Sequence, residues 1–206
     1  LHLHTQYSLL DGALKIKELF KKAKEANMPA VACTDHGNMF GAIDFYKQAL
    51  EHNIKPILGS EIYFTAGSRF DRRSFQKNKV ISNQDGEENK YHIHHLVLLC
   101  KNEIGYKNLC KLISKAYLEG FYYKPRADIE LLKEYSEGII ATTACLKGEV
   151  NYNFFIDEDK KAVEAIHKLQ EVYKEDFYLE IQENGLQEQK KANLKILDFA
   201  KKNNTK

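Results

Sequence analysis

The stretch Ala30-Val31-Ala32-Cys33-Thr34-Asp35-His36-Gly37 joins a short apolar run directly to a polar turn. A run that is apolar on both faces is typical of a buried strand in a parallel sheet. In α/β folds, the loops beyond the carboxyl ends of such strands form the functional sites. This stretch therefore predicts a buried strand with functional side chains at its end.

Similar strand-like runs lie on both sides of this stretch and alternate with amphipathic segments. The other strand-like runs are Leu1–His4, Ile57–Phe64, His95–Cys100, Gly138–Thr143 and Phe177–Gln182. Apolar residues recur at helical spacing in Ala13–Ala26 and again around Ile166 and Ile196. Repeated strand–helix units predict an α/β fold, either a barrel or a doubly wound sheet.

Length and composition indicate an ordinary globular domain. The chain has 206 residues, of which 43% are hydrophobic and 29% are charged, and this length suits a single domain. It contains neither an apolar run of roughly 18 residues that would span a membrane nor the start of a signal peptide. The four cysteines are far apart and form no C-x-x-C pair. This spacing favours a reduced, cytoplasmic protein over a disulfide framework.

The charge pattern leaves contact with nucleic acid open. A domain that holds duplex DNA by itself usually carries a strong basic excess, whereas the net charge here is only +2. Residues 66–90 interrupt the strand–helix alternation, beginning basic and ending acidic. We expect a surface insertion there, and a solvated loop is favoured over a nucleic-acid contact.

Residue types that bind metals collect at the predicted strand ends. His2 and His4 alternate along the first strand and therefore point to one face. Asp11 follows in the turn before the first helix, and His36 lies in the turn after the second strand. Later strands add Glu61, His95 and Cys145.

Taken singly, each of these residues has an ordinary interpretation. A lone histidine at a strand end is usually a surface residue, Glu61 alone would pair with a lysine, and Cys145 alone would be a small buried hydrophobe. Together, imidazole, carboxylate and thiolate groups suit zinc, manganese or iron. The combination favours a cluster of divalent metal ions that activates water and clamps phosphoester oxygens. His52, His92 and His167 lie away from the strand ends, and we expect them to be structural.

These motifs resemble those of the polymerase and histidinol phosphatase (PHP) family. They appear here as His2-Leu3-His4-Thr5, Thr34-Asp35-His36-Gly37, Glu61 and His95. The resemblance implies a distorted (β/α)7 barrel of the TIM type with a metal cluster at its mouth. We expect a single PHP domain over residues 1–206, C-terminally incomplete because the barrel stops before its last strand.

The resemblance also implies up to three metal positions in the complete domain, holding zinc or manganese. Glu61 is expected to bridge the first two positions. The first adds His2 and His4, the second adds His95 and Cys145, and the third uses Asp11 and His36. Asp35 is expected to support these ligands without binding metal. Positions one and three each end on a late Asp-x-His motif in the family, and none follows Glu149 here.

Within the family, the resemblance narrows to the bacterial DNA polymerase III alpha subunits. It continues between the metal motifs, in residues 2–12, 54–59, 117–126 and 144–149. It implies the N-terminal domain of a replicative polymerase, with DNA synthesis carried out by the full protein. The role of the domain is then 3′-to-5′ exonuclease activity or docking of a separate proofreading exonuclease subunit, and the partners are DNA and other replicase subunits.

Two other hypotheses remain. One is a free-standing PHP phosphoesterase of the histidinol phosphatase type, which would carry the same metal cluster. The other is a catalytically silent interaction module. Residues 117–126 and 144–149 favour the polymerase, because they belong to that resemblance and not to the metal cluster. The complete set of candidate ligands, from His2 to Cys145, argues against the silent module.

Overall fold

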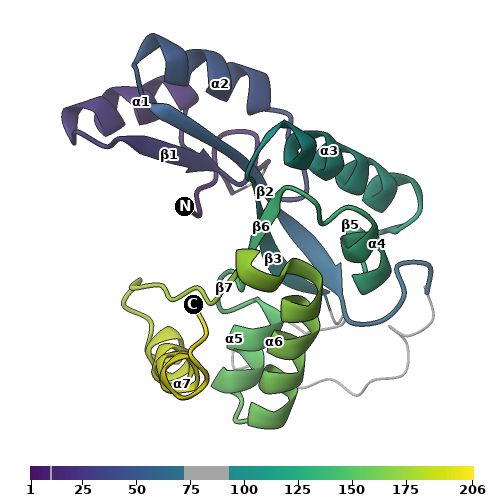
Figure 1. The fold of residues 1–206 in the computed structure, drawn as a ribbon. Coiled ribbons are helices and arrows are strands. Elements are labelled where there is room, and N and C mark those ends of the chain that lie inside the picture. The colour runs from purple at the N-terminus through teal and green to yellow at the C-terminus, as the bar shows by residue number, and fades with distance from the viewer. Residues whose placement is uncertain (10, 72–92) are drawn as a thin grey trace.

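The computed structural model describes residues 1–9, 11–71 and 93–206, and Figure 1 shows their arrangement. The helices are α1 (Ile16–Glu25), α2 (Ala42–Glu51), α3 (Glu103–Leu118), α4 (Ile129–Glu134), α5 (Glu149–Phe155), α6 (Asp159–Tyr173) and α7 (Gln187–Asn203). The strands are β1 (Ala30–Cys33), β2 (Lys55–Thr65), β3 (Ile93–Cys100), β4 (Phe121–Tyr122), β5 (Lys124–Ala127), β6 (Ile139–Thr142) and β7 (Phe177–Tyr178). Among the helices described, none has the length and apolar character needed to cross a bilayer.

The strands form one mixed sheet in the order β4-β5-β2-β3-β6-β7, with β1 also paired to β2. β1 and β5 run parallel to β2, whereas β3 runs antiparallel to both β2 and β6. The sequence-based expectation of parallel strands was therefore wrong for β3. An apolar run looks the same in either direction, so the pattern that identified the strand carried no information on its orientation.

The α/β class is confirmed, but the (β/α)7 barrel is not. Over the described residues, β4 and β7 are the two ends of the strand order and the sheet stays open. The expected first strand, Leu1–His4, has no regular secondary structure and lies beside the end of β1. The Thr34 N–H donates to the Leu3 carbonyl (2.9 Å), but the Leu3 N–H donates to the Thr34 hydroxyl (2.8 Å). A side chain thus takes the place of the second ladder bond, and no regular strand forms.

Two apolar cores hold the helices against the sheet. α1 and α2 pack on β1 around Phe20 and Phe45, whose ring centroids are 4.9 Å apart. The larger core joins α3 to α7 with β2, β3 and β6, around Leu98 and Ile166. In Figure 1, α1 and α2 lie together at one end of the molecule and α5, α6 and α7 at the other. Burial of each large apolar side chain contributes about 1.5–3 kcal/mol, so these cores hold the helices firmly against the strands. The strands and the turns that follow them carry most of the candidate ligands.

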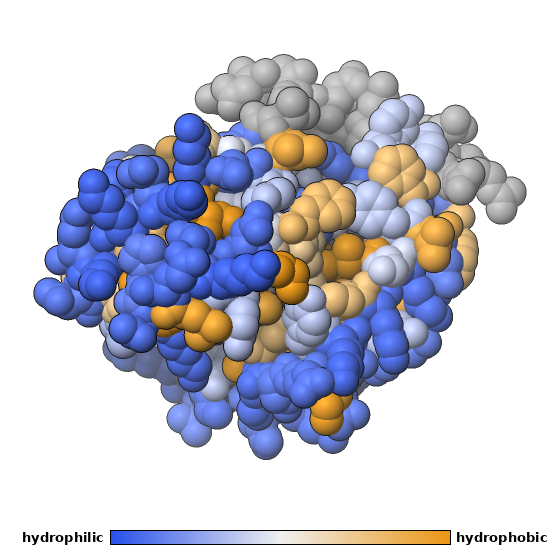
Figure 2. Space-filling model, turned by 90° about the horizontal axis from the view of Figure 1, so that it is seen from above, coloured by the Kyte–Doolittle hydropathy of each residue, from blue (hydrophilic) through white to orange (hydrophobic). Residues whose placement is uncertain are grey.

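The surface is mixed in character. Figure 2 shows hydrophobic side chains exposed in patches on a face that is otherwise largely hydrophilic. Exposed large hydrophobic residues include Phe40, Ile43, Leu50 and Phe121. Isolated exposed apolar residues are ordinary, so only those that gather at a site bear on function.

The described start of the expected 66–90 insertion is anchored by two arginines, and most of the rest lies outside the described residues. Arg69 donates to Glu119 (2.6 and 2.8 Å) and to Asp128 (2.8 Å). Arg126 is almost fully buried. It donates to the backbone carbonyls of Gly120, Arg69 and Asp71. The basic residue Arg69, expected in a solvated loop, therefore fastens the chain to the end of α3 and the start of α4.

Candidate metal centre

Glu61 lies at the centre of the site, where β2 is flanked on both sides. On one side it pairs in register with Val97 of β3. On the other, its N–H approaches the carbonyls of Thr34 and Asp35 (3.2 Å each), and its carbonyl accepts the N–H of Gly37 (2.8 Å). The side chain is 1% exposed. The backbone on both sides therefore fixes a buried carboxylate at the point where the polar turn after β1 meets β2.

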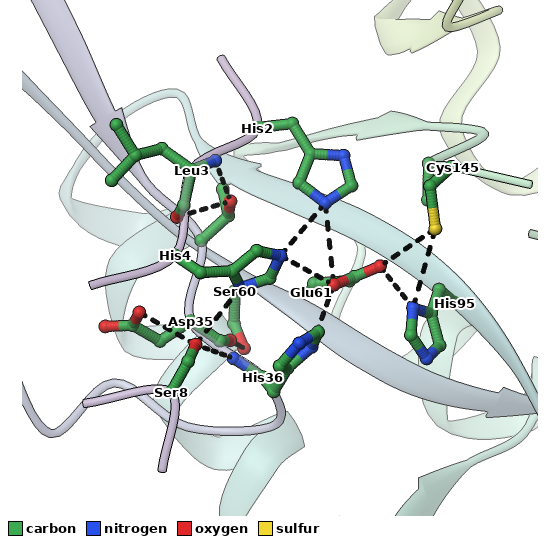
Figure 3. A network of polar contacts seen from close by, with 12 residues as sticks. His2, Leu3, His4, Ser8, Asp35, His36, Ser60, Glu61, His95 and Cys145 are labelled. Atoms are coloured by element: carbon green, nitrogen blue, oxygen red, sulfur yellow. Dashed lines mark hydrogen bonds and ion pairs between the residues drawn. The ribbon is translucent and has the colours of Figure 1, made fainter. Parts of the chain in front are cut away.

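Four histidines surround this carboxylate (Figure 3). Oε2 of Glu61 lies 2.8 Å from His36 Nδ1, 3.0 Å from His4 Nε2 and 3.5 Å from His2 Nε2. The other oxygen, Oε1, contacts Nδ1 of His95. Histidines from the N-terminal segment, the turn after β1 and strand β3 thus converge on a single acidic side chain.

The remaining predicted ligands lie at the edges of this group. Cys145 Sγ is 3.6 Å from Glu61 Oε1 and 3.7 Å from His95 Nδ1. Asp11 Oδ2 is 2.8 Å from His36 Nε2, and its side chain is 60% exposed. The structure therefore brings the seven candidates into one contiguous cluster, with Cys145 buried deeper than Asp11.

His36 lies between Asp11 and Glu61. The family resemblance assigned it with Asp11 to a separate third position. In the structure, His36 contacts Asp11 through Nε2 and Glu61 through Nδ1. Its imidazole therefore links the outer carboxylate to the central one, and His36, Glu61 and His95 offer donor atoms that all lie within 4.8 Å of one another.

The hydrogen bonds of His2 and His4 set which ring nitrogen faces Glu61. His4 Nδ1 contacts the Ser8 hydroxyl (3.0 Å), and His2 Nδ1 contacts Glu180 (2.7 Å). With those nitrogens donating, both Nε2 atoms direct lone pairs toward Glu61 Oε2, and they lie 3.3 Å from each other. These two nitrogen lone pairs and the carboxylate oxygen repel one another, so a proton or a cation is needed between them.

The pKa values of Glu61, His2 and Cys145 also indicate that positive charge is needed at this site. Burial would raise the pKa of Glu61, but the neighbouring His2, His36 and His4 hold it far below its usual value. Burial would lower the pKa of His2, but Glu180 and Glu61 outweigh this effect and raise it to about 9. Burial and the Glu61 charge raise the pKa of the Cys145 thiol to about 12. A divalent cation would supply the positive charge that protons supply here, and it favours the thiolate.

Two groups of side chains have donor atoms close enough together to bind a metal ion. One is His2, His4 and Glu61, and the other is His36, Glu61 and His95. In the second group, His36 Nδ1 and Glu61 Oε2 are buried and only 2.8 Å apart, yet their orientation does not suit a hydrogen bond. Buried polar atoms rarely stay unpaired. The donor types and their directions therefore fit two neighbouring divalent cations that share Glu61.

Asp35 supports the cluster from behind. It is 1% exposed and accepts hydrogen bonds from the Thr5 N–H (2.6 Å), the Thr5 hydroxyl (2.8 Å) and the Ser8 hydroxyl (3.0 Å). Ser8 in turn contacts His4 Nδ1 and accepts the backbone N–H of His36 (3.0 Å each). The Asp35 carboxylate therefore positions two of the predicted ligands through Ser8, while the Asp35 backbone carbonyl approaches the N–H of Glu61.

Sequence reasoning missed Glu180, which braces His2. One of its oxygens contacts His2 Nδ1 and accepts from the Gln182 amide (2.8 Å), while the other accepts from the Thr142 hydroxyl. Metal-binding histidines commonly donate their second ring N–H to a carboxylate, which fixes the tautomer. Glu180 lies just after β7, and the rule that polar residues at strand ends form the site would have selected it.

The histidines expected to be structural have no place in this cluster. His52 lies at the end of α2, where Nδ1 contacts the Gln48 carbonyl (2.8 Å). His167 of α6 packs near the ring of Phe199. His92 lies outside the described residues. The four cysteines are free thiols.

Asn151 of α5 holds the loop that carries Cys145. Its side-chain nitrogen donates to the carbonyls of Ala144 (2.7 Å), Cys145 (2.9 Å) and, more weakly, Thr143 (3.3 Å). Ala144 has a left-handed backbone with φ of 57°, a conformation that non-glycine residues adopt only at a cost. The Asn151 amide therefore stabilises the strained turn that places the thiol next to Glu61.

Replacing Asn151 with leucine is expected to reduce the free energy of unfolding by about 2 kcal/mol, because it leaves buried carbonyls without a donor. The thiol should also lose its fixed position. Urea unfolding measures the first effect, and the sulfur-to-metal charge-transfer band of the Co²⁺-loaded protein measures the second. Asn108→Leu is the matched control, since Asn108 donates a single exposed bond to the Glu137 carbonyl. An undiminished band in Asn151→Leu would contradict the positioning role.

Comparison with known proteins identifies a matching family and similar proteins. The family model described as "PHP domain" matches residues 1–184. The DNA polymerase III subunit alpha of Aquifex aeolicus (strain VF5) is 53% identical over 206 residues, covering 100% of this chain and 17% of the relative. The subunit of Thermus aquaticus is 45% identical over 204 residues, covering 98% and 16%. That of Helicobacter pylori (strain ATCC 700392 / 26695) is 47% identical over 200 residues, covering 92% and 15%.

The chain thus spans less than a fifth of the length of these relatives. A solved structure described as a putative metal-dependent phosphoesterase from Bifidobacterium adolescentis has a TM-score of 0.35 at 17% identity, covering 57% of this chain and 32% of that chain. That likeness is too weak to carry an argument. The family model, in contrast, covers most of the chain and every candidate ligand. The chain therefore belongs to the PHP domain family.

Proposed function

We propose that this chain is the metal-binding domain of a DNA polymerase III alpha subunit, and that its cluster hydrolyses phosphodiester bonds. The observation that carries the proposal is the buried Glu61 carboxylate, which two groups of imidazole donors share. Two cations on either side of a common ligand clamp the attacking and leaving oxygens of a phosphoester, which is the arrangement of many nucleases and phosphatases.

The proposed ligands follow from the contacts of the described residues. His2, His4 and Glu61 hold a first cation. Glu61 and His95 hold a second, with His36 as the third member of this donor group and Cys145 beside Glu61 and His95. His36 also contacts Asp11. Imidazole and carboxylate ligands suit zinc and manganese alike, and the Cys145 thiolate favours zinc. When bound, the metal supplies Lewis acidity and lowers the pKa of water.

The chain's own groups orient this chemistry. Glu180 and Ser8 fix the tautomers of His2 and His4, so that the ligand nitrogens point inward. The exposed Asp11 carboxylate stands at the mouth beside His36, where it can take up a proton released by water. In the reaction, the oxygen of water bonds to phosphorus while the bond from phosphorus to the leaving alkoxide breaks, and the alkoxide takes a proton from solvent.

The names of the relatives support the polymerase context. DNA synthesis then belongs to the full protein, whose partners are DNA, other replicase subunits and a proofreading exonuclease subunit, in the cytoplasm. A 3′-to-5′ exonuclease activity of the cluster suits that setting. We also assign residues 1–206 to a single domain whose open sheet is part of a barrel. The histidinol phosphatase alternative is disfavoured, because similarity to the polymerase subunits extends along the whole chain. The silent module is disfavoured by the assembled ligands.

The expected result is slow, metal-dependent hydrolysis of a 5′-labelled single-stranded oligonucleotide, with no template-directed DNA synthesis. Addition of a chelator should abolish the hydrolysis, and Mn²⁺ or Zn²⁺ should restore it. His95→Asn is expected to lower the rate at least about 100-fold, because even loss of a group that only supports a metal ligand costs about 10–100-fold. Gel electrophoresis of the products measures each rate, and His52→Asn is the matched control away from the cluster. Hydrolysis that persists in chelator would rule out the proposal, and turnover of histidinol phosphate alone would favour the phosphatase.

A further inference from the structure

A hollow of about 420 Å³ adjoins the cluster and has an aromatic wall. It reaches the predicted ligands Asp11, His36 and His95. Its aromatic lining consists of Phe40, Tyr63, Tyr117, Phe121 and Tyr123. Phe121 is 49% exposed and Tyr123 is 65% exposed. Large rings that stay in contact with water around one hollow, rather than in a core, indicate a binding surface.

The rings at the rim are held in defined positions. Tyr117 and Phe121 are stacked, with centroids 6.1 Å apart and an interplanar angle of 18°. Tyr122 and Tyr123 meet edge to face at 4.6 Å. Tyr123 has a left-handed backbone with φ of 61°, which is unfavourable for a bulky residue. The strained turn sets the Tyr123 ring at the edge of the hollow instead of in the interior.

Tyr63 connects the hollow to the cluster. Its ring stacks on His36 at 6.2 Å and meets His95 edge to face at 5.6 Å. Gly37 leaves space for this ring, because a Cβ there would lie 2.9 Å from it. A ligand in the hollow would therefore lie next to His36 and His95, which are candidate metal ligands.

The lysines of the hollow favour an anionic ligand, and its aromatic side chains favour a ligand with a flat ring. Lys124 and Lys147 line it, and Asp11 is the only acidic residue among its described lining. Lys124 Nζ lies 5.0 Å over the Tyr63 ring, and the Lys147 carbonyl accepts the backbone N–H of His95 (3.0 Å). Aromatic faces next to lysines are the combination that binds single-stranded nucleic acid, with bases on the rings and phosphates near the cations.

We infer that this hollow holds the terminal nucleobase of a single strand whose phosphodiester lies at the metal cluster. The inference rests on the proposed hydrolysis and names its substrate as an unpaired strand end. The base stacks on Phe121 and Tyr123, and Lys124 and Lys147 neutralise the flanking phosphates. Stacking uses the face of a base and not its hydrogen-bonding edge, so binding is independent of sequence. A paired end keeps its base in the duplex and binds poorly.

The test measures fluorescence anisotropy of a labelled oligothymidylate in chelator, where no hydrolysis occurs. The probe is compared with two versions that lack the base at either the 3′ or the 5′ terminal nucleotide. Loss of the base that is bound is expected to weaken binding roughly tenfold, as removal of a stacking partner does. The Phe121→Leu/Tyr123→Leu variant should bind all three probes alike, because leucine keeps the apolar volume but not the flat ring.

Tyr46→Leu is the matched control, since Tyr46 is an exposed ring on α2 that does not line the hollow. Urea unfolding of both variants verifies that they fold. Equal binding of the three probes by the unaltered chain, or base discrimination that survives loss of both rings, overturns the inference. Metal-dependent turnover of bis(4-nitrophenyl) phosphate by the unaltered chain tests the hydrolysis separately. If the unaltered chain does not hydrolyse this phosphodiester but still binds the base through the two rings, the proposed function is overturned and the base-binding site stands.

Discussion

The Glu61→Gln variant is expected to bind much less metal than the His36→Ala variant. Its affinity for the first cation and its affinity for the second cation should each fall by roughly 100-fold or more. Glu61 belongs to both groups of converging donors, whereas His36 belongs to one. The neutral amide no longer balances two cations, whose mutual repulsion is then less screened. The amide also directs N–H groups at imidazole nitrogens or at a metal, where an acceptor is needed.

Metal per chain after dialysis against a metal buffer, measured by mass spectrometry, tests this expectation. Glu51→Gln is the matched control, because Glu51 is an exposed residue of α2 that bonds only to Gln48 among the contacts described. The control should retain the metal content of the unaltered chain. Equal metal content in Glu61→Gln and His36→Ala would show that Glu61 does not bridge.

The part of the site that follows from strand periodicity was predictable from the sequence. Glu61 and His95 lie in strands that the apolar runs predicted, and His36 follows another. Parallel neighbours in a sheet bring their carboxyl ends together, and for β1 and β2 this rule held. His95 reached the same place by a different route. β3 is antiparallel to β2, so the amino end of β3, where His95 lies, pairs with the carboxyl-terminal half of β2.

What the sequence did not reveal depends on contacts between distant segments. Glu180 reaches His2 across 178 positions of the chain, and no local pattern encodes such a contact. The aromatic hollow was missed for another reason. Phe121 and Tyr123 are exposed rings next to a strained turn, so they follow neither the period of a buried strand nor that of an amphipathic helix. The resemblance identified residues 117–126, but it assigned them no chemistry.

Asp35→Ala is expected to reduce the free energy of unfolding by about 3 kcal/mol, even when no metal is present. Asp35 is buried and accepts hydrogen bonds from the N–H and hydroxyl of Thr5, the hydroxyl of Ser8 and the thiol of Cys33. Bonds to a charged acceptor are worth more than neutral ones, and their loss leaves buried donors unpaired. The Asp35 carboxylate also holds Ser8, which contacts Nδ1 of His4, so His4 should lose its position as well.

Urea unfolding in the presence of chelator measures the stability effect without any contribution from bound metal. Asp44→Ala is the matched control, because Asp44 accepts one exposed hydrogen bond from Tyr7 (2.7 Å) and should change stability by less than about 0.5 kcal/mol. Asp35→Asn should fall between the two, since its amide oxygen can still accept from the Thr5 N–H and the Ser8 hydroxyl, while its NH₂ cannot accept from the Thr5 hydroxyl or the Cys33 thiol. If Asp35 only stabilised the fold, Asp35→Asn would retain full metal content. A loss of metal from the first position in this variant, under conditions in which it is still folded, would show that the carboxylate also orients His4.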